Sequence, residues 1–169
     1  MTGVQTCALP ICGEASLYDA SGARVGGFGA GTSFAAGVDG QLIASDGPWG
    51  EACQWLCGPD GTAVSPRFQQ LLPLCGGPYA YLVMDGAEYY SDDLGALQRS
   101  WDYRGMRYGL ADAGGRRITE ALYSEIRALG SGRLLLISGE GTMLSDLDGN
   151  VLRAWTTART TAPSGEADA

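Results

Sequence analysis

The stretch RYGLADAGGRRITEALYSEIRALGSGRLLLI, residues 107 to 137, decides the fold. It opens with an aromatic-glycine pair, Tyr108 and Gly109, and a short strand that turns at Gly115. A second strand then ends at Tyr123, and a leucine-bearing connection leads to the apolar strand RLLLIS. Short runs of aromatic and branched residues between glycine turns are typical of β-hairpins. The stretch therefore predicts antiparallel β-structure.

The same order of parts occurs in residues 46 to 84, DGPWGEACQWLCGPDGTAVSPRFQQLLPLCGGPYAYLVM. The interval from the hairpin glycine to the glycine before the last strand is 16 residues here, from Gly61 to Gly77, and 17 in the first stretch, from Gly115 to Gly132. Repetition of this kind indicates stacked units that share one core. The corresponding pairs are Trp49 with Tyr108, Gly61 with Gly115, and Phe68 with Tyr123.

Three shorter segments resemble parts of this unit. A partial unit precedes Asp46, and hairpins are expected at 84 to 101 and 139 to 155. The Asp60-Gly61 and Asp148-Gly149 pairs are strong hairpin signals, because both residue types tolerate a positive φ. The nearest helical candidate is ITEALYSEIRAL, 118 to 129, where the repeat places a strand end and a connection, so a short helical turn is the lesser alternative there.

These residues resemble the WG-repeat family, bacterial arrays whose unit runs from an aromatic-glycine pair through a strand and an Asp-x-x-Gly turn to further strands. The resemblance covers residues 16 to 155 and is best at 103 to 138. It implies an all-β fold of tandem hairpins, either an elongated solenoid-like stack or a curved propeller-like meander. It also implies a non-catalytic module that binds a protein or another ligand.

Composition excludes several other classes. The 169 residues contain no His and no Lys, and 11 Arg stand against 19 Asp and Glu for a net charge of -8. An acidic chain lacks the basic face that binds nucleic acid phosphates. No apolar run approaches the roughly 18 residues of a membrane helix. We therefore expect a globular domain with neither nucleic acid nor membrane as partner, and its compartment stays open.

The aromatic residues are assigned first to the core. Trp49, Tyr108, Phe68 and Tyr123 are expected to be buried at equivalent positions, together with leucines of RLLLIS such as Leu134 and Leu136. A row of exposed aromatic residues that holds a glycan or a peptide is the lesser alternative. Neighbouring strand residues point to opposite faces, so one of Tyr89 and Tyr90 should face solvent. The candidate binding residues are Tyr79, Tyr81, Tyr89 and Tyr90.

No catalytic residue, metal site or cofactor is predicted. Triads that use His cannot be built from this chain. The segment GGFGAGTS, 26 to 33, lacks the lysine of a phosphate-binding loop and is expected to be a flexible or degenerate repeat connection. DLDGN, 146 to 150, fits a hairpin turn better than a calcium loop. Asp92 and Asp93 are expected in a solvated turn, although a glycan-active enzyme that uses them is the alternative function.

The cysteines are expected to be free. Cys53 and Cys57 lie four residues apart on one strand, about 13 Å at roughly 3.3 Å per residue, which is too far for a disulfide. Both, with Cys75, are expected to be buried thiols that pack as small apolar groups.

The two ends are expected to lie outside the repeat domain. Residues 1 to 12, MTGVQTCALPIC, resemble the translation of a short-read sequencing adapter and are expected to be an artefact that replaces the true start. Residues 13 to 155 are expected to form the degenerate β-repeat domain. Residues 156 to 169 are polar and small and are expected to be a disordered tail.

Overall fold

The chain is all β, as the sequence predicts. The computed structural model describes residues 15–19, 21–47, 53–84, 87–91, 97–101 and 105–156, and only the backbone of 87–91 and 97–101. The strands are β1 (Ala15–Tyr18), β2 (Arg24–Phe28), β3 (Ser33–Ala36), β4 (Leu42–Ser45), β5 (Gln54–Cys57), β6 (Gln70–Pro73), β7 (Tyr79–Val83), β8 (Ala87–Ser91), β9 (Leu97–Trp101), β10 (Arg107–Ala111), β11 (Glu125–Gly130), β12 (Arg133–Ser138), β13 (Gly141–Asp146) and β14 (Val151–Thr156).

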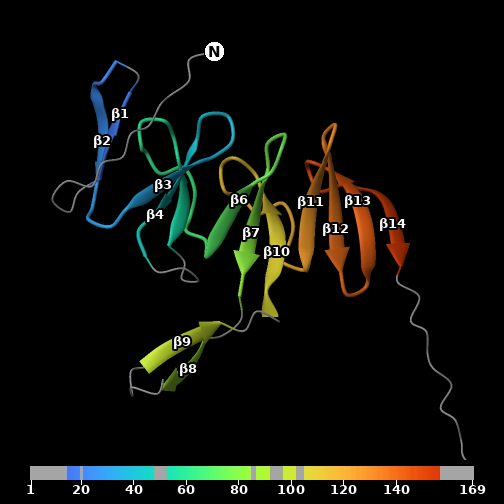
Figure 1. The fold of residues 1–169 in the computed structure, drawn as a ribbon. Coiled ribbons are helices and arrows are strands. Elements are labelled where there is room, and N and C mark those ends of the chain that lie inside the picture. The colour runs from blue at the N-terminus through green and yellow to red at the C-terminus, as the bar shows by residue number, and fades with distance from the viewer. Residues whose placement is uncertain are drawn as a thin grey trace, which may run out of the picture.

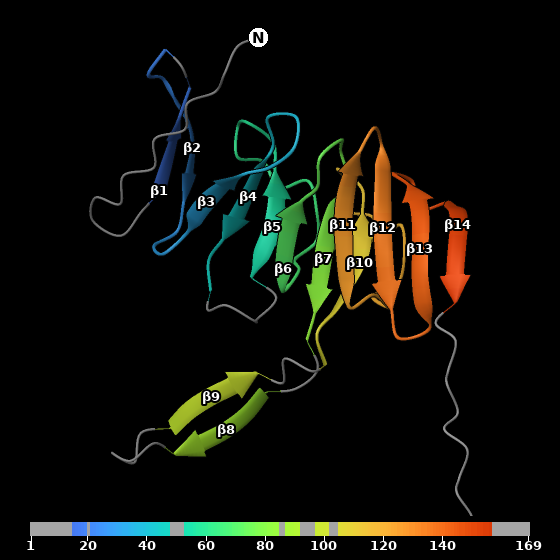
Figure 2. The ribbon, with the colours of Figure 1, turned by 45° about the vertical axis from the view of Figure 1, so that its right-hand side comes forward.

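Four of the antiparallel sheets follow one another as layers. The first layer is β1-β2, the second β3-β4-β5, the third β6-β7-β10 and the fourth β11-β12-β13-β14, while β8 and β9 pair only with each other. The layers run in chain order, with the first and the fourth at opposite ends (Figures 1 and 2). The described chain therefore forms an open stack of layers.

The repeat is visible in its backbone hydrogen bonds. Gln54 exchanges both backbone hydrogen bonds with Phe68 on the returning segment, at 3.0 and 2.7 Å, and Tyr108 does the same with Tyr123, at 2.7 and 3.1 Å. In the first layer Ala15 pairs with Phe28, and in the fourth Thr142 pairs with Trp155. Each unit thus places an aromatic residue at the end of its returning segment. This aromatic series is Phe28, Phe68, Tyr123 and Trp155.

Two parts of the predicted alignment are wrong. The pairing equates Tyr108 with Gln54, five positions beyond Trp49, which itself lies outside the described residues. The expected leucine-bearing connections are strands β6 and β11, because their backbones pair with β7 and β12.

Two other segments also have a defined structure. Residues 118 to 129 form no helix, and residues 26 to 33 run through β2 and a turn into β3 rather than a flexible connection.

Aspartate turns start the return in three units. The Asp112 carboxylate accepts the N–H groups of Gly114 and Arg116 at 3.0 and 2.9 Å, and Asp146 accepts those of Asp148 and Asn150 at 3.0 and 2.8 Å. Asp19 accepts in the same way from the residues two and four positions later. An aspartate that bonds the backbone ahead of it fixes a tight turn. DLDGN is therefore a hairpin turn, as expected.

The turn glycines also join neighbouring layers. Gly61, Gly115 and Gly149 have φ values of 83°, 76° and 79°, which confirms the predicted left-handed turns. A Cβ on Gly115 would lie 2.2 Å from the Ser65 Cβ of the preceding returning segment, whereas a Cβ on Gly22 of the first layer would meet nothing within 4 Å. The turn of each later unit therefore packs against the unit before it.

The core lies between the layers, in three clusters. Leu17 and Trp55 pack between the first and second layers, Leu56 and Tyr81 between the second and third, and Leu110 lies between the third and fourth with Tyr123, Leu134 and Leu136. The predicted burial of Phe68, Tyr123, Leu134 and Leu136 is confirmed. Tyr108 is only half-buried.

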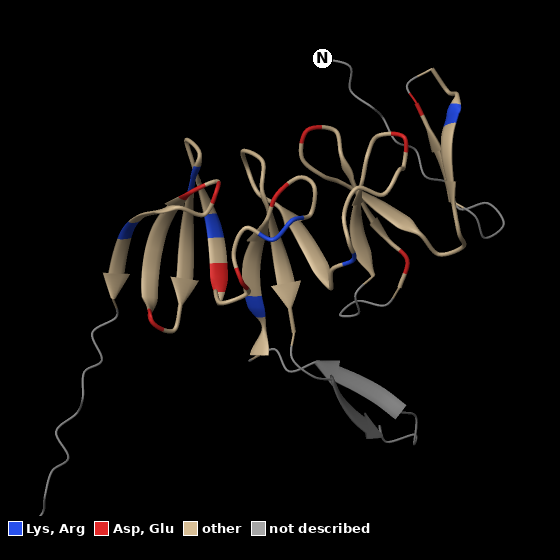
Figure 3. Cartoon of the chain, turned by 180° about the vertical axis from the view of Figure 1, so that it is seen from behind, with Lys and Arg blue, Asp and Glu red and all other residues tan. Residues whose placement is uncertain are grey.

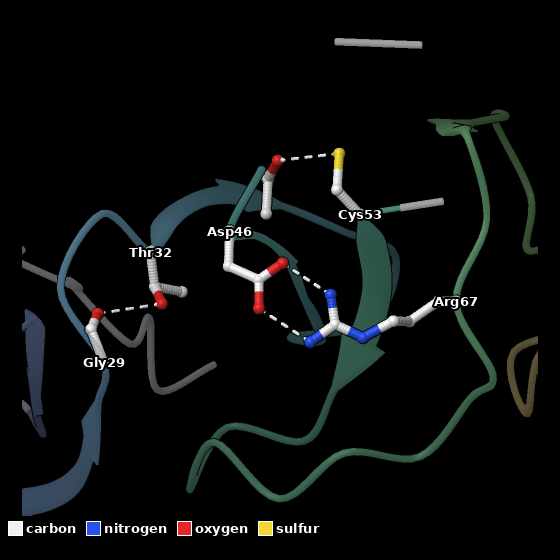
Figure 4. Close-up of polar contacts among 6 residues, drawn as sticks. Gly29, Thr32, Asp46, Cys53 and Arg67 are labelled. Atoms are coloured by element: carbon white, nitrogen blue, oxygen red, sulfur yellow. Dashed lines mark hydrogen bonds and ion pairs between the residues drawn. The ribbon is translucent and has the colours of Figure 1, made fainter. Parts of the chain in front are cut away.

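An ion pair ties the second layer together near one edge. The Arg67 guanidinium binds both carboxylate oxygens of Asp46, one of them at 2.6 Å, and lies 4.2 Å over the Trp55 ring (Figure 4). The hydrogen bond from Arg67 lowers the pKa of Asp46 below its usual value. Both charges are satisfied by each other, so this cluster is structural.

Candidate functional site

The face of the fourth layer that points away from the third layer is the strongest candidate site, and we call it the outer face. Leu134 and Leu136 of β12 point inward into the core, so the residues between them point outward. Cross-strand pairing places the outward side chains in two rows that cross all four strands, beside the outward pair of Arg133 and Asp146. Row A is Glu125, Ile137, Thr142 and Trp155, and row B is Arg127, Leu135, Leu144 and Arg153.

The outer face repeats positions that are buried in the earlier layers. Counted from the turn, Leu144 of β13 corresponds to Leu110 of β10, Leu56 of β5 and Leu17 of β1. Those three leucines are all 0% exposed, because the next layer covers each of them. Leu144 is half-buried, and no strand follows β14 in the described chain. The last leucine of this series therefore has no covering layer among the described residues.

The aromatic series behaves in the same way. Phe68 and Tyr123 are 5% and 8% exposed, whereas Trp155 is 43% exposed. The Arg153 guanidinium lies 5.0 Å over the Trp155 ring, and a recess of about 160 Å³ lies beside it, next to Thr142 and Met143. Trp and Arg are the residue types that most often carry binding energy at protein interfaces.

Opposite charges mark the β11 edge of this face. Glu125 and Arg127 lie on β11, two residues apart, and the Arg127 Nε donates to the Glu125 carboxylate. This bond lowers the pKa of Glu125 below its usual value and raises that of Arg127. Their side chains are 44% and 60% exposed, so both charges remain accessible. Figure 3 shows acidic and basic segments on the strands and turns of this last sheet.

A second depression lies between the third and fourth layers. It has a volume of about 240 Å³, and its walls include Leu72, Tyr108 and Ile126. Pockets for small molecules usually measure roughly 300 to 1,000 Å³. We therefore regard it as a gap between layers rather than as the principal site.

The expected aromatic platform is wrong for two of its four residues. Tyr79 and Tyr81 are 0% and 1% exposed, so neither ring is open to a ligand. Tyr79 Oη accepts the Val38 N–H of the second layer at 2.6 Å, and Tyr81 Oη donates to the Thr119 carbonyl of the segment that returns along β10 at 2.8 Å. Burial raises the pKa of both phenols.

The other sequence candidates in this group cannot be placed. The side chains of Tyr89 and Tyr90 lie outside the described residues, as do Asp92 and Asp93.

The three cysteines of the described chain differ in exposure. Cys53 and Cys57 are buried, as expected, whereas Cys75 is exposed, contrary to the expectation. Burial raises the pKa of the Cys57 thiol, which favours the protonated, less nucleophilic form. Cys53 lies 3.7 Å from the Ser45 hydroxyl (Figure 4). Within the described ranges no group of three or more metal-ligating side chains comes together.

Comparison with known proteins adds no family. The chain matches no family model and no curated protein. Across the described residues, no helix has the length and apolarity needed to cross a membrane.

Sequence reasoning missed the outer face because it identified only the buried side of RLLLIS, with Leu134 and Leu136. The signal that could have found it is the last hairpin. Trp155 repeats the aromatic position of Phe68 and Tyr123. Its exposure depends on whether another layer covers it, which strand alternation alone does not show.

Proposed function

We propose that this chain is a non-catalytic β-repeat module of the WG type that binds a β-sheet layer of a protein partner on its outer face. One observation carries the proposal. Leu144 follows three leucines, and Trp155 follows Phe68 and Tyr123, that are all buried by the layer after them, whereas Leu144 is half-buried and Trp155 is 43% exposed.

Energetics support binding at this face. Fully burying an exposed leucine contributes roughly 1.5 to 3 kcal/mol, and a partner that covers the half-buried Leu135, Ile137 and Leu144 would gain part of this for each of them. Isolated exposed apolar side chains are ordinary, but contiguous ones mark interaction sites. The three are neighbours on β12 and β13, since Leu135 pairs directly with Leu144.

The recurring Asp-x-x-Gly turns and the aromatic series support the repeat assignment. Asp19, Asp112 and Asp146 start the same turn in three units. A repeat unit buries its faces only against its neighbours, so a unit that has no covering neighbour among the described residues offers a surface shaped for another unit.

The proposal can be tested by supplying the covering layer in the same chain. Trp155 corresponds to Tyr123, so residues 125 to 138, which form the β11-β12 hairpin, would follow Thr156 in register. In a variant that carries this second hairpin in place of 157 to 169, we expect a higher melting midpoint and slower amide exchange in β13.

The matched control carries the same added hairpin with the copies of Leu134 and Leu136 changed to Asp, which removes the apolar side that would pack on the outer face. An equal melting midpoint for the variant and this control would refute the proposal.

A further inference from the structure

We propose that the partner is a second copy of this chain, bound outer face to outer face about a two-fold axis that runs across the strands. This inference rests on the proposed function, since it names the layer that the outer face receives. Two-fold dimers are the commonest symmetric assemblies, and their interface must be self-complementary. A two-fold dimer of this kind therefore requires the side chains of the outer face to complement one another.

Row A and row B complement each other when the two-fold axis lies between them, at right angles to the strands. Rotation about this axis places each strand over the same strand of the second copy and exchanges the rows, so row A of one copy faces row B of the other. Ile137 then faces the second copy's Leu135, and Thr142 faces its Leu144. Sheets that pack face to face keep their strands within about 30° of each other, which this arrangement allows.

The charges favour the same arrangement. Row A begins with Glu125 and row B with Arg127, so each carboxylate faces the guanidinium of the other copy, twice across the two-fold axis. At the opposite edge Trp155 faces the second copy's Arg153, a pairing of a cation with an aromatic ring. The lowered pKa keeps the Glu125 carboxylate ionised at neutral pH.

The other orientation is disfavoured. An axis parallel to the strands would place β11 over β14 of the second copy, with each row facing itself. Arg127 would then lie opposite the second copy's Arg153, and like charges across an interface oppose association. Charge therefore selects one of the two symmetric dimers.

The area of the outer face limits how strongly two copies can associate. Four strands at about 4.8 Å spacing and six residues at about 3.3 Å cover roughly 20 by 20 Å, or about 400 Å² for each copy. Stable complexes bury about 800 Å² on each partner. We therefore expect weak, concentration-dependent association of the 17.6 kDa chain rather than a permanent dimer.

The test uses sedimentation equilibrium on the full chain and on two variants, Glu125→Arg and Arg127→Glu. The unchanged chain should approach twice its monomer mass as its concentration rises towards the millimolar range. Each variant alone faces like charges at two symmetric positions and should associate at least about tenfold more weakly. The side chains are well exposed, so both variants should keep the far-UV spectrum and melting midpoint of the monomer.

Mixing the two variants decides between a second copy and any other partner. One variant carries Arg at both positions and the other carries Glu at both, so the mixed pair has opposite charges at both contacts. We expect the equimolar mixture to regain the association that each variant lacks. A mixture that stays monomeric, or single variants that associate as well as the unchanged chain, would overturn the proposal.

The two experiments distinguish a failure of the dimer from a failure of the proposed function. If the unchanged chain stays monomeric at about 1 mM while the added 125 to 138 hairpin still raises the melting midpoint, the outer face binds a layer but not a second copy, and the dimer is refuted. If the added hairpin has no effect, the proposed function itself fails.

Discussion

Leu110 and Leu144 occupy the same place in two successive units, yet one is fully buried and the other only half-buried. Each pairs with the middle strand of its own layer, Leu110 with Ala80 and Leu144 with Leu135. The difference is the layer that follows: β11 and β12 cover Leu110, and in the described chain nothing of the kind follows Leu144. Burial in this fold is thus decided by the neighbouring unit rather than by the residue or its own sheet.

The largest effect should come from truncating both leucines. Leu110→Ala leaves a cavity between the third and fourth layers and should lower the free energy of unfolding by about 2 to 5 kcal/mol. Leu144→Ala removes a side chain that is already partly in water and should cost about 1 kcal/mol or less. Urea unfolding at low protein concentration measures both. Equal losses would mean that the two positions are not equivalent in the way described.

The turn glycines give the next largest contrast. Gly115→Val should lower the free energy of unfolding by more than the roughly 1 to 2 kcal/mol of the left-handed backbone penalty, because its Cβ would also collide with Ser65. Gly22→Val is the matched control, since its φ is 84° and open space surrounds it. It should show the backbone penalty alone. A Gly115 variant that unfolds at the same urea midpoint as the Gly22 variant would contradict the packing of turns on the preceding layer.

A smaller effect concerns a hydroxyl that both middle units share. The Leu110 N–H donates to Thr119 Oγ1 at 3.0 Å, as the Leu56 N–H does to Ser65 Oγ at 2.8 Å. In the fourth layer Arg153 of β14 pairs directly with Leu144 instead. Thr119→Val should cost about 1 kcal/mol of stability through the lost hydrogen bond, and Thr119→Ser should restore most of it. If Val and Ser behave alike in urea unfolding, the hydroxyl has no part in holding the unit.

The smallest effect is on the response to acid. Burial alone would raise the pKa of Asp112, but hydrogen bonds from Arg116 and Gly114 outweigh it and leave the pKa lowered. The stability this gives is present above the unfolded pKa of about 3.9 and is lost as pH falls through the folded value. Between pH 5 and 2.5 the urea midpoint of Asp112→Asn should therefore fall less than that of the unchanged chain. A steeper fall in the variant would reverse the sign of this account.

The all-β class and the turns were predictable because their signals are local. A glycine one to three residues after an aspartate is a short-range hairpin signal, and Gly61, Gly115 and Gly149 all adopt the expected φ. The register of the repeat was harder to predict from the sequence. Trp49-Gly50 resembles Tyr108-Gly109, but the residue equivalent to Tyr108 is Gln54, which has no aromatic ring.

The burial of individual aromatic residues was not predictable from strand alternation. Tyr79 and Tyr81 lie on the inner face of a layer that is covered on both sides, and their hydroxyls bond Val38 and Thr119 of neighbouring units. Sequence alternation distinguishes the two faces of a strand but does not show whether another layer covers a face. The outer face was missed for the same reason.

The central claim is that equivalent side chains are covered in the third layer and open in the fourth. Paramagnetic relaxation of methyl groups by a soluble nitroxide tests it most directly, on dilute protein with labelled Leu and Ile. We expect weak relaxation at Leu110 and at Leu82 of β7, which are 0% and 1% exposed, and strong relaxation at the half-buried Ile137 and Leu144. The relaxation of Ile137 and Leu144 should fall as the concentration rises and the outer faces pair. Ile137 and Leu144 methyls as protected as those of Leu82 and Leu110 in the most dilute sample would contradict it.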